Sequence, residues 1–402
     1  MSGLDQTGDS MKYRVRVLNQ VSTNGLKRLP SERFAVSADA EEPHAILLRS
    51  ADLHRAPIPD SLLAVGRAGV GVNNIPVAAL SARGVPIFNS PGANANAVKE
   101  LVLSGLLLAA RNLDGALGFS GRLDPSDPEL EARVEAGKKE FAGYELAGHT
   151  LGVIGLGKIG CLVADAAIKL GMKVIGYDPE ITVDAAWSLP STVKKAHHLG
   201  EVLKHSDFVT LHVPLLEATR NMIDAAGVAQ LRSGAVLLNF SRGGVVDEAA
   251  VIDALETKRL GHYVCDFPAP HLIGRGGVIL LPHLGASTRE AEENCAIMVA
   301  EQVRDYLLDG SIVNAVNFPA VTLPRESPFR IAIANANVPN MVAQVSHEMG
   351  QQGLNIATMT NKSRGDIAYT LVDVDSHVPD GVIAGIAALE GVLKVRYLPL
   401  AD

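Results

Sequence analysis

The sequence predicts an α/β protein that is built on parallel sheets and ends in a smaller unit of mixed strands and helices. Three observations predict this class. Apolar runs at 208–212, 235–239, 263–266 and 278–281 are unbroken and alternate with helical stretches, as in strands that helices cover on both faces. A glycine-rich turn joins two further apolar strands near the middle of the chain. Between 329 and 400 the pattern is βαββαβ, which is ferredoxin-like.

The glycine-rich turn is typical of a site for a dinucleotide. An apolar strand runs into the motif Gly155-x-Gly157-x-x-Gly160, and a helix and a second strand lead from there to Asp178. Gly155 permits the tight turn, Gly157 lets the backbone approach a pyrophosphate, and Gly160 lets helix and strand pack closely. The N-terminus of the helix offers free N–H groups to the phosphates. These elements fall in the order of a Rossmann fold.

Asp178 also indicates which dinucleotide is bound. A carboxylate at the end of the second strand can accept hydrogen bonds from a ribose diol. The next residues are Pro179 and Glu180, and no Arg or Lys stands beside them. A 2′-phosphate would therefore meet negative charge, so the sequence favours NAD over NADP.

Short strands and helices precede and follow this region. We expect strands at 13–18, 45–48, 63–66 and 85–89 and a long apolar helix at 98–111. A helix at 289–308 carries the chain away from the last parallel strand and back toward the first unit. Residues 317–327 hold two prolines and no periodicity, so we expect a linker there. The C-terminal unit is predicted as strands 329–334, 356–363, 367–375 and 393–400 with helices 340–351 and 380–388.

Composition and charge exclude several classes of partner. The chain has 402 residues and a formal net charge of −8, which argues against nucleic acid. Cys161, Cys265 and Cys295 are scattered without metal-ligand spacing, which favours a reducing compartment. Residues 1–10 lack the basic start and apolar core of a secretory signal, and the apolar stretch 101–110 is too short to span a bilayer. We therefore expect a cytoplasmic protein without a membrane partner.

Two loops that follow parallel strands carry residues suited to acid chemistry. Arg242 follows the strand at 235–239 and precedes two glycines, which leave room for a ligand that its guanidinium could bind as a fork. His283 follows Pro282 at the end of the strand at 278–281, and a histidine there suits a general acid or base near neutral pH. Both loops lie at the same edge of the predicted sheet, which favours a shared site over two isolated surface residues.

The first unit contains two further candidates for anion binding. The stretch from Arg67 to Asn74 is a glycine-rich turn after a strand, and the N–H groups around Gly69 and Gly71 could form a nest for a carboxylate. Arg49 and Ser50 end another strand and could hold a phosphate or a second carboxylate. Each pattern also fits an ordinary turn.

With these motifs assembled, the chain resembles the D-2-hydroxyacid dehydrogenase family, and within it the D-3-phosphoglycerate dehydrogenase branch that carries a C-terminal ACT domain. The motifs RAGVGVNN, NSPGANANAVKE, GVIGLGKIG, NFSRGGVVDEAAV and LPHLGAST follow the family's order. The resemblance implies a flavodoxin-like substrate domain at 11–95 and 286–318, interrupted by a Rossmann-type NAD domain at 96–285. It implies a ferredoxin-like ACT domain at 328–402.

The resemblance also implies roles for individual residues. Arg242 would bind the carboxylate and oxo groups of the substrate, and His283 would be the acid/base. The substrate contacts would include Arg49, Ser50, Gly69, Gly71 and Asn94. The NAD contacts would be Gly155, Gly157, Lys158, Ile159, Gly160, Asp178, Val213, Phe240, Ser241, Asp266, Gly285, Ala286 and Val70, with Asp266 near the nicotinamide amide. No metal is expected.

Two positions depart from the family's pattern. The family places a glutamate behind the catalytic histidine, and the matching position here, 29 residues after Arg242, is His271. If His271 stands behind His283, it cannot supply negative charge there; the alternative is a rearranged loop with an exposed His271. The ACT ligand loop is also altered, and we expect an amide-rich effector site for an amino acid at Asn335, Asn337 and Asn355.

The sequence thus predicts an enzyme that oxidises D-3-phosphoglycerate to 3-phosphohydroxypyruvate with NAD, the first step of L-serine biosynthesis. Its substrate would be a phosphorylated small 2-hydroxy acid, and ACT pairing predicts a homodimer or homotetramer. One alternative is a reductase of hydroxypyruvate, glyoxylate or another 2-oxo acid. Another is a regulatory protein that senses NAD(H) and an amino acid without turnover, which the missing carboxylate at position 271 keeps open.

Overall fold

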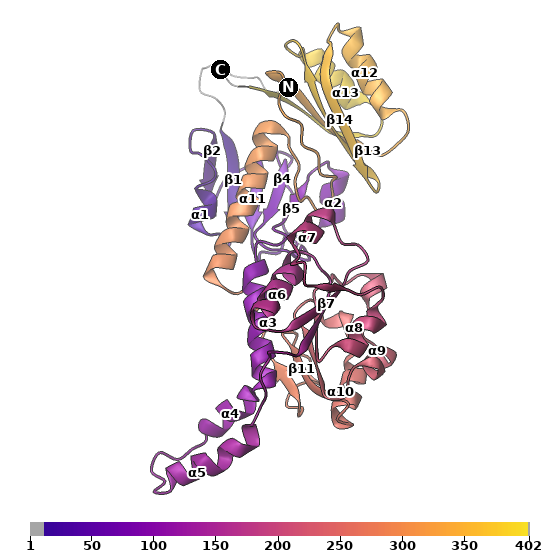
Figure 1. Ribbon diagram of the computed structural model, residues 1–402. Coiled ribbons are helices and arrows are strands. Elements are labelled where there is room, and N and C mark those ends of the chain that lie inside the picture. The colour runs from indigo at the N-terminus through magenta and orange to yellow at the C-terminus, as the bar shows by residue number, and fades with distance from the viewer. Residues whose placement is uncertain (1–11, 401–402) are drawn as a thin grey trace. The chain divides into compact units, whose positions relative to one another are not determined.

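The computed structural model describes residues 12–400 and divides them into two compact units, 12–93 with 292–400 and 94–291. Residue 11, where the predicted first domain begins, lies outside the described residues. The fold is an α/β arrangement of two parallel sheets with an additional antiparallel sheet near the C-terminus (Figure 1).

The first unit contains a five-stranded parallel sheet. Its order is β2 (Phe34–Ser37), β1 (Tyr13–Leu18), β3 (Ala45–Leu48), β4 (Ala64–Arg67) and β5 (Ile87–Phe88). Helices α1 (Thr23–Leu26), α2 (Val77–Ala82) and α11 (Arg289–Asp309) belong to the same fold. The predicted return of the long helix is confirmed, because Val299 and Val303 of α11 share a core with Val15 and Leu47 of the sheet.

The antiparallel sheet belongs to the same unit. It runs in the order β14 (Ile356–Arg364), β15 (Ile367–Val374), β13 (Phe329–Ala336) and β16 (Val392–Pro399). Helices α12 (Met341–Gln351) and α13 (Asp380–Ala388) cover one face. The other face adds Tyr369 and Leu371 to the core around α11. The predicted linker 317–327 is part of this core too, since Phe318 and Val321 are buried in it.

Charged side chains are buried where this sheet meets the C-terminal end of α11. Arg396 donates hydrogen bonds to the carbonyl oxygens of Tyr306 and Leu307, and its guanidinium lies 4.7 Å from the centroid of the Tyr306 ring. Arg330 is fully buried and forms two hydrogen bonds with Asp373. The two arginines thus supply donors and positive charge to the carbonyl end of a helix, where both are stabilising.

The second unit is a seven-stranded parallel sheet with Rossmann topology. The order is β12 (Val278–Leu280), β11 (Leu260–Cys265), β10 (Ala235–Asn239), β9 (Phe208–Leu211), β6 (Thr150–Ile154), β7 (Lys173–Tyr177) and β8 (Lys194–Lys195). Every pairing is parallel. The chain order reverses between β6 and β9, and ligands of such sheets bind where the strand order reverses.

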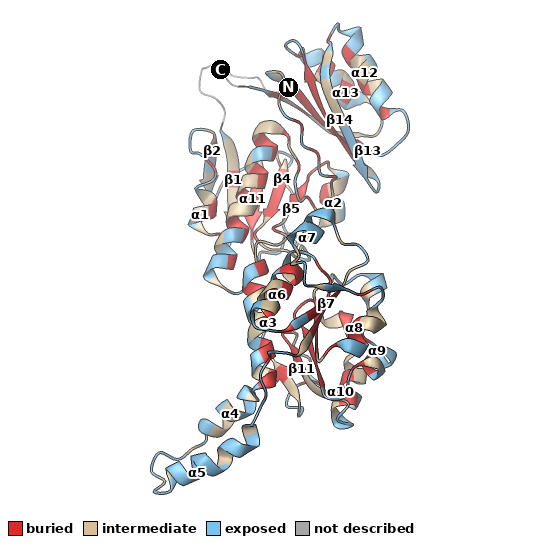
Figure 2. Cartoon of the chain, viewed as in Figure 1, coloured by how far each residue is buried: buried red, intermediate tan, exposed pale blue. Residues whose placement is uncertain are grey.

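Helices cover both faces of this sheet, as the unbroken apolar strands require. One core packs α3 (Ala95–Ala110) and α6 (Lys158–Lys169) against the strands, with Val102, Leu106 and Val163 fully buried. The other core lies under α8 (Leu199–His205), α9 (Ala225–Gln230) and α10 (Glu248–Glu256). A short helix, α7 (Val183–Ser188), follows β7. Figure 2 shows the buried residues concentrated along the strands.

A helical arm leaves the second unit after α3. It consists of α4 (Leu113–Ser120), α5 (Leu130–Gly137) and a short 3₁₀ turn, η1 (Lys138–Phe141). The rings of Phe119 and Phe141 hold it together at 5.5 Å between centroids. Among residues 12–400 no single helix is long and apolar enough to cross a membrane; α3 and α4 pass that test only as a pair bent by 73°, and half of α3 is buried.

Candidate active site

The glycine-rich turn has the geometry that a pyrophosphate needs. Gly155 adopts φ +89°, and a Cβ on it would lie 2.5 Å from the carbonyl oxygen of His212. A Cβ on Gly160 would lie 2.0 Å from the carbonyl oxygen of Gly155. A Cβ on Gly157 would meet nothing within 4 Å of the described atoms, so the backbone is open at that point. Gly157 immediately precedes α6, whose first N–H groups face this opening.

The carboxylate of Asp178 is fixed beside this turn. Its two oxygens accept hydrogen bonds from the backbone N–H groups of Leu156, at 2.8 Å, and Glu180, at 2.9 Å. Each carboxylate oxygen keeps a second acceptor site for a ribose hydroxyl. Val213 lies at the same turn, because a Cβ on Gly155 would come within 2.9 Å of its side chain. Lys158 and Ile159 begin α6 and complete the predicted cofactor loop.

Arg242 projects from the loop that follows β10. Its side chain is exposed, and Nη1 donates a hydrogen bond of 2.6 Å to the carbonyl oxygen of Ser241. The residues before it are anchored, since Phe240 and Ser241 are 6% and 8% exposed. The ring of Phe240 packs closely against Gly105 of α3. A rigid loop therefore presents a guanidinium whose remaining donors can bind an acid.

His283 lies on the loop that follows β12 and is held through its backbone. Its φ is +49°, an uncommon conformation for a residue other than glycine. Its N–H donates to the carbonyl oxygens of Asp266, at 2.9 Å, and Leu281, at 3.1 Å. The imidazole is exposed, and its centroid lies 5.1 Å from that of the Phe267 ring at an interplanar angle of 63°. The ring nitrogens are thus available to a substrate.

Asp266 follows β11, the strand between β10 and β12, and so lies between the Arg242 loop and the His283 loop. Its side chain is 1% exposed, and Oδ2 accepts a hydrogen bond from the Gly285 N–H at 3.1 Å, while Oδ1 has no partner among the described atoms. Burial raises the pKa of Asp266, and the Gly285 N–H and the charges of His283 and Arg242 oppose that rise. The structure therefore brings Arg242, Asp266 and His283 together, with a buried acceptor that suits the amide of a nicotinamide.

Several other predicted residues lie where a ligand could contact them. Asn94 immediately precedes α3, and its Oδ1 is buried without a hydrogen-bond partner in the described part of the chain. Ala286 is exposed beside Gly285. An unsatisfied buried oxygen is unfavourable, so Asn94 is suited to accept a hydrogen bond from a ligand.

Arg49, a predicted substrate contact of the first unit, already has partners within the protein. Arg49 forms an ion pair of 2.7 Å with Glu292 of α11, so a phosphate would have to share or replace that partner. The carbonyl oxygen of Arg49 accepts from Nδ2 of Asn74, which ties its loop to the glycine-rich turn. Gly69 adopts φ +155°, and a Cβ on Gly71 would meet nothing within 4 Å. Ser50 is exposed, and the carbonyl oxygen of Val70 accepts from Nδ2 of Asn89.

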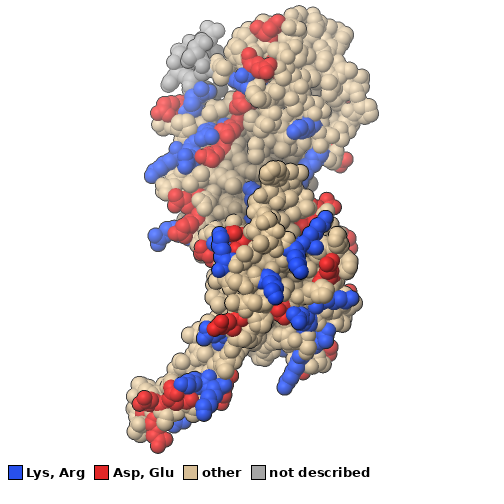
Figure 3. All heavy atoms as spheres, in the orientation of Figure 1, with Lys and Arg blue, Asp and Glu red and all other residues tan. Residues whose placement is uncertain are grey.

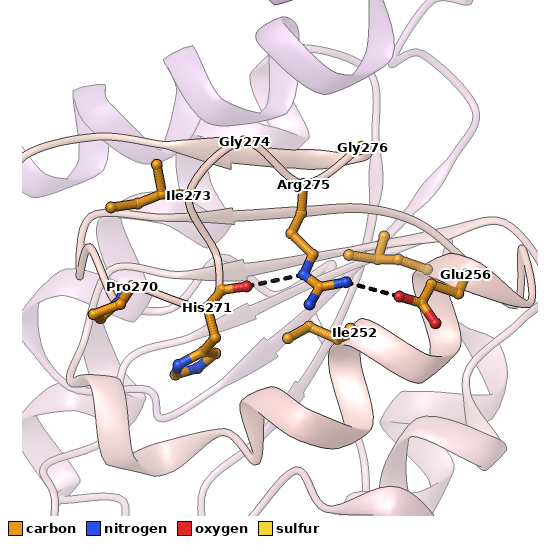
Figure 4. A pocket seen from close by; sticks show the side chains of 9 residues that line it. Ile252, Glu256, Pro270, His271, Ile273, Gly274, Arg275 and Gly276 are labelled. Atoms are coloured by element: carbon orange, nitrogen blue, oxygen red, sulfur yellow. Dashed lines mark hydrogen bonds and ion pairs between the residues drawn. The ribbon is translucent and has the colours of Figure 1, made fainter.

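The position of His271 fits the alternative of a rearranged loop, because its side chain is half exposed and paired with Glu248. Nε2 of His271 donates to Oε2 of Glu248, the first residue of α10, at 2.5 Å. Arg275 continues this attachment, since it donates to the His271 carbonyl oxygen at 3.0 Å and pairs with Glu256 at 2.8 Å (Figure 4). The loop is thus fastened to α10, and no hydrogen bond joins His271 to His283 among the described residues. His271 instead lines an open pocket with Ile252 and its neighbours.

The three predicted effector amides do not gather within one chain. Strands β13 and β14 both pair antiparallel with β15, so they run in the same direction. Asn335 and Asn337 lie at the end of β13, whereas Asn355 precedes the start of β14 at the opposite end of the sheet. Nδ2 of Asn335 donates to the carbonyl oxygen of Ala336, and Nδ2 of Asn337 donates to that of Gly365. Each amide nitrogen thus uses one of its two N–H donors within the chain.

Two residues near the site were missed by the sequence interpretation. Asn239 ends β10 and bonds to the Arg242 loop, and only its place in the NFSRGG motif hinted at this. His212 follows β9; burial lowers its pKa to about 3, and its Nδ1 has no partner in the described structure. No group of three or more His, Cys, Asp or Glu in residues 12–400 is arranged to hold a metal ion.

This geometry defines a class: a Rossmann enzyme with an arginine and a histidine beside a dinucleotide turn. Residues 116–285 match the family model of the D-isomer specific 2-hydroxyacid dehydrogenase, NAD binding domain. The D-3-phosphoglycerate dehydrogenase of Escherichia coli K12 is 33% identical over 356 residues, which cover 84% of this chain and 82% of that protein. The D-3-phosphoglycerate dehydrogenase of Synechocystis is 38% identical over 328 residues, or 79% of this chain and 55% of its own length.

A solved structure shares the fold. The apo D-mandelate dehydrogenase of Rhodotorula graminis matches with a TM-score of 0.63 and 24% identity, over 78% of this chain and all of that one. The chain therefore belongs to the D-isomer specific 2-hydroxyacid dehydrogenase family. It is an NAD-dependent dehydrogenase.

Proposed function

We propose that this enzyme oxidises D-3-phosphoglycerate to 3-phosphohydroxypyruvate. Arg242 binds the substrate carboxylate as a two-pronged donor and keeps C2 in a fixed orientation. His283 accepts the proton of the C2 hydroxyl while the C2 hydrogen leaves with its electron pair, so that the carbonyl forms. NAD, when bound, accepts that hydride. Asp266 holds the His283 loop through its backbone and side chain.

The observation that carries this proposal is the placement of Arg242, Asp266 and His283 after three neighbouring parallel strands, β10, β11 and β12, with the buried Asp266 bonded to the His283 loop. The relatives act on a phosphorylated 2-hydroxy acid by name, which supports the substrate. Arg49, Ser50 and the Gly69–Gly71 turn are the proposed contacts of the first unit with the remainder of the substrate. This proposal requires Arg49 to exchange Glu292 for a phosphate.

A panel of acids tests the substrate. NADH formation is measured with D-3-phosphoglycerate, L-3-phosphoglycerate and D-glycerate, and NADH consumption with hydroxypyruvate and glyoxylate. The proposal expects the highest kcat/KM for D-3-phosphoglycerate and none for its enantiomer. A higher kcat/KM with glyoxylate or hydroxypyruvate would assign the enzyme to the reductases instead. Binding of NADH without turnover of any acid would favour the sensor.

We also propose that the enzyme is a homodimer or homotetramer whose helical arm contacts a second copy. Helices α4 and α5, all of whose residues are described, contain no buried residue. Leu117 is 69% exposed, and Leu113 and Val134 of the same arm are exposed too. The tip of the arm carries charges of both signs (Figure 3). An arm with exposed apolar side chains and no buried residue in either helix suits burial against an identical chain.

Light scattering after gel filtration tests this assembly. Leu117→Asp should lower the assembly mass or raise its dissociation constant, because a charge would enter the interface. The matched control is Ile273→Asp, since Ile273 is 66% exposed on a loop outside the arm. A monomeric wild type, or equal effects of both substitutions, would contradict the proposal.

We assign residues 328–402 to an ACT domain, residues 11–95 and 286–318 to the substrate domain and residues 96–285 to the NAD domain. A cytoplasmic location is supported by three buried, free cysteines. Because Asn335 and Asn337 lie at the opposite end of the sheet from Asn355, an amino-acid effector would need amides from two paired copies. Calorimetry with the common amino acids should show binding that Asn337→Ala weakens; no heat and no inhibition would remove this proposal.

A further inference from the structure

Asn239 lies beneath the Arg242 loop and uses its whole side-chain amide there. It is the last residue of β10 and is fully buried. Its Nδ2 donates to the Arg242 carbonyl oxygen at 2.9 Å. Its Oδ1 accepts from the Ser241 N–H at 3.1 Å and from the Ser241 Oγ at 2.9 Å. The Tyr263 hydroxyl is a weaker neighbour of Nδ2 at 3.5 Å.

The orientation of this amide is fixed by its partners. A backbone N–H only donates, so the atom facing Ser241 N must be the amide oxygen. A carbonyl oxygen only accepts, so the atom facing Arg242 must be the amide nitrogen. Asn239 therefore bridges the peptide group that precedes Ser241 and the peptide group that follows Arg242. No other side chain of this size offers a donor and an acceptor from one planar group at this distance from the backbone.

Within the loop itself, the Arg242 carbonyl oxygen accepts one longer hydrogen bond, from the Val245 N–H at 3.3 Å, and the Asn239 amide adds a shorter one at 2.9 Å. Arg242 is extended, with φ −153° and ψ +144°, and Gly243 and Gly244 follow it directly. Glycines lose more conformational freedom on ordering than other residues. The position of the guanidinium depends on the direction of the Arg242 backbone, and small displacements of a binding group reduce rates strongly.

We propose that Asn239 is a positioning residue that aims Arg242 at the substrate carboxylate. The inference rests on the proposed function, because it assigns that role to Arg242. Asn239 does not contact the substrate itself; it acts through the backbone of Ser241 and Arg242. Asn239 therefore contributes to catalysis by orienting Arg242.

A double-mutant cycle tests this inference. Asn239→Ala should lower kcat/KM for D-3-phosphoglycerate by roughly 10- to 100-fold, while the dissociation constant of NADH changes less than about threefold. In an Arg242→Ala background the same substitution should cost less than about threefold, because its target is gone. Asn239→Asp, which keeps the acceptor and loses the donor to the Arg242 carbonyl, should also lower kcat/KM with the fold retained.

The matched control is Asn317→Ala. Asn317 makes three comparable hydrogen bonds, to the Ile87 N–H, the Ser81 hydroxyl and the Val85 carbonyl oxygen. Asn317→Ala should lower the melting temperature but should not lower kcat/KM for D-3-phosphoglycerate selectively. Losses that multiply in the Asn239/Arg242 double variant would overturn the inference, as would wild-type kcat/KM in Asn239→Asp. Wild-type activity in Arg242→Ala would instead remove the proposed role of Arg242, and the inference with it.

Discussion

Removal of Asp373 should destabilise the first unit strongly. Arg330 is 0% exposed, and its Nε and Nη2 bond to Asp373 at 2.6 and 2.8 Å. Asp373→Ala would leave the buried guanidinium with Asp309, which pairs with Nη1 at 3.0 Å and is partly exposed. Breaking a buried pair costs about 3–5 kcal/mol, and the remaining carboxylate places this case near the lower end. For a unit of this size, about 3 kcal/mol corresponds to roughly 6–12 °C in Tm.

Two probes separate the units in this assay. The single tryptophan, Trp187, lies in the second unit, so its fluorescence follows that unit, whereas calorimetry follows both. Asp373→Ala should lower the midpoint temperature of one calorimetric transition and leave the midpoint of the transition seen by tryptophan fluorescence unchanged. The control is Asp165→Ala, whose pair with Lys169 is as short, 2.6 Å, but exposed, and it should change Tm by no more than about 2 °C.

A compensating variant sharpens the test. Arg330→Met combined with Asp373→Leu should recover much of the lost stability, because apolar residues of similar volume can replace a buried pair. If Asp373→Ala lowers stability by less than about 1 kcal/mol, the buried pair between β13 and β15 does not stabilise the sheet, and the account of this pair is wrong.

Three further predictions concern the second unit. Wild-type kcat/KM should favour NAD over NADP by at least about tenfold, and Asp178→Ala should narrow that ratio; equal values for both cofactors in the wild type would contradict the role of Asp178. Arg242→Ala should weaken the binding of acid substrates by roughly 2–5 kcal/mol, as initial rates will show. His283→Ala should lower kcat by a factor on the order of 10²–10⁴, whereas NADH titrations should show that the cofactor still binds. Burial holds the pKa of His212 at about 3. The unfolded chain therefore takes up an additional proton below about pH 6.5, and stability should fall by up to ~1.4 kcal/mol per pH unit between there and pH 3, a slope that His212→Gln should reduce in urea titrations.

The order of the strands and the cofactor turn could be predicted from local patterns. The strand at Tyr13–Leu18 and the helix at Asp380–Ala388 have the predicted bounds, because apolar periodicity and flanking turns define them. The arm α4–α5 was not predicted, since its helices face no core and carry no apolar stripe that a pattern could reveal. The edge strand β8 is only two lysines long and was missed for the same reason.

Tertiary contacts decided what the sequence could not. Whether His271 faces His283 depends on the attachment of its loop to α10, which Glu248 and Arg275 provide from separate parts of the chain. The three effector asparagines lie close in sequence, yet strand direction places them at opposite ends of one sheet. Asn239 looked like an ordinary strand end until its hydrogen bonds to the Arg242 loop were seen.

Hydride transfer from D-3-phosphoglycerate is the most direct test of the proposed function. The purified full-length chain is mixed with NAD and D-3-phosphoglycerate carrying deuterium at C2, and the reduced nicotinamide is analysed by mass spectrometry. The account predicts NADH that carries the deuterium, at a rate that Arg242→Ala and His283→Ala both reduce. NADH without the label, or no NADH from this substrate while another 2-hydroxy acid is oxidised, would contradict it.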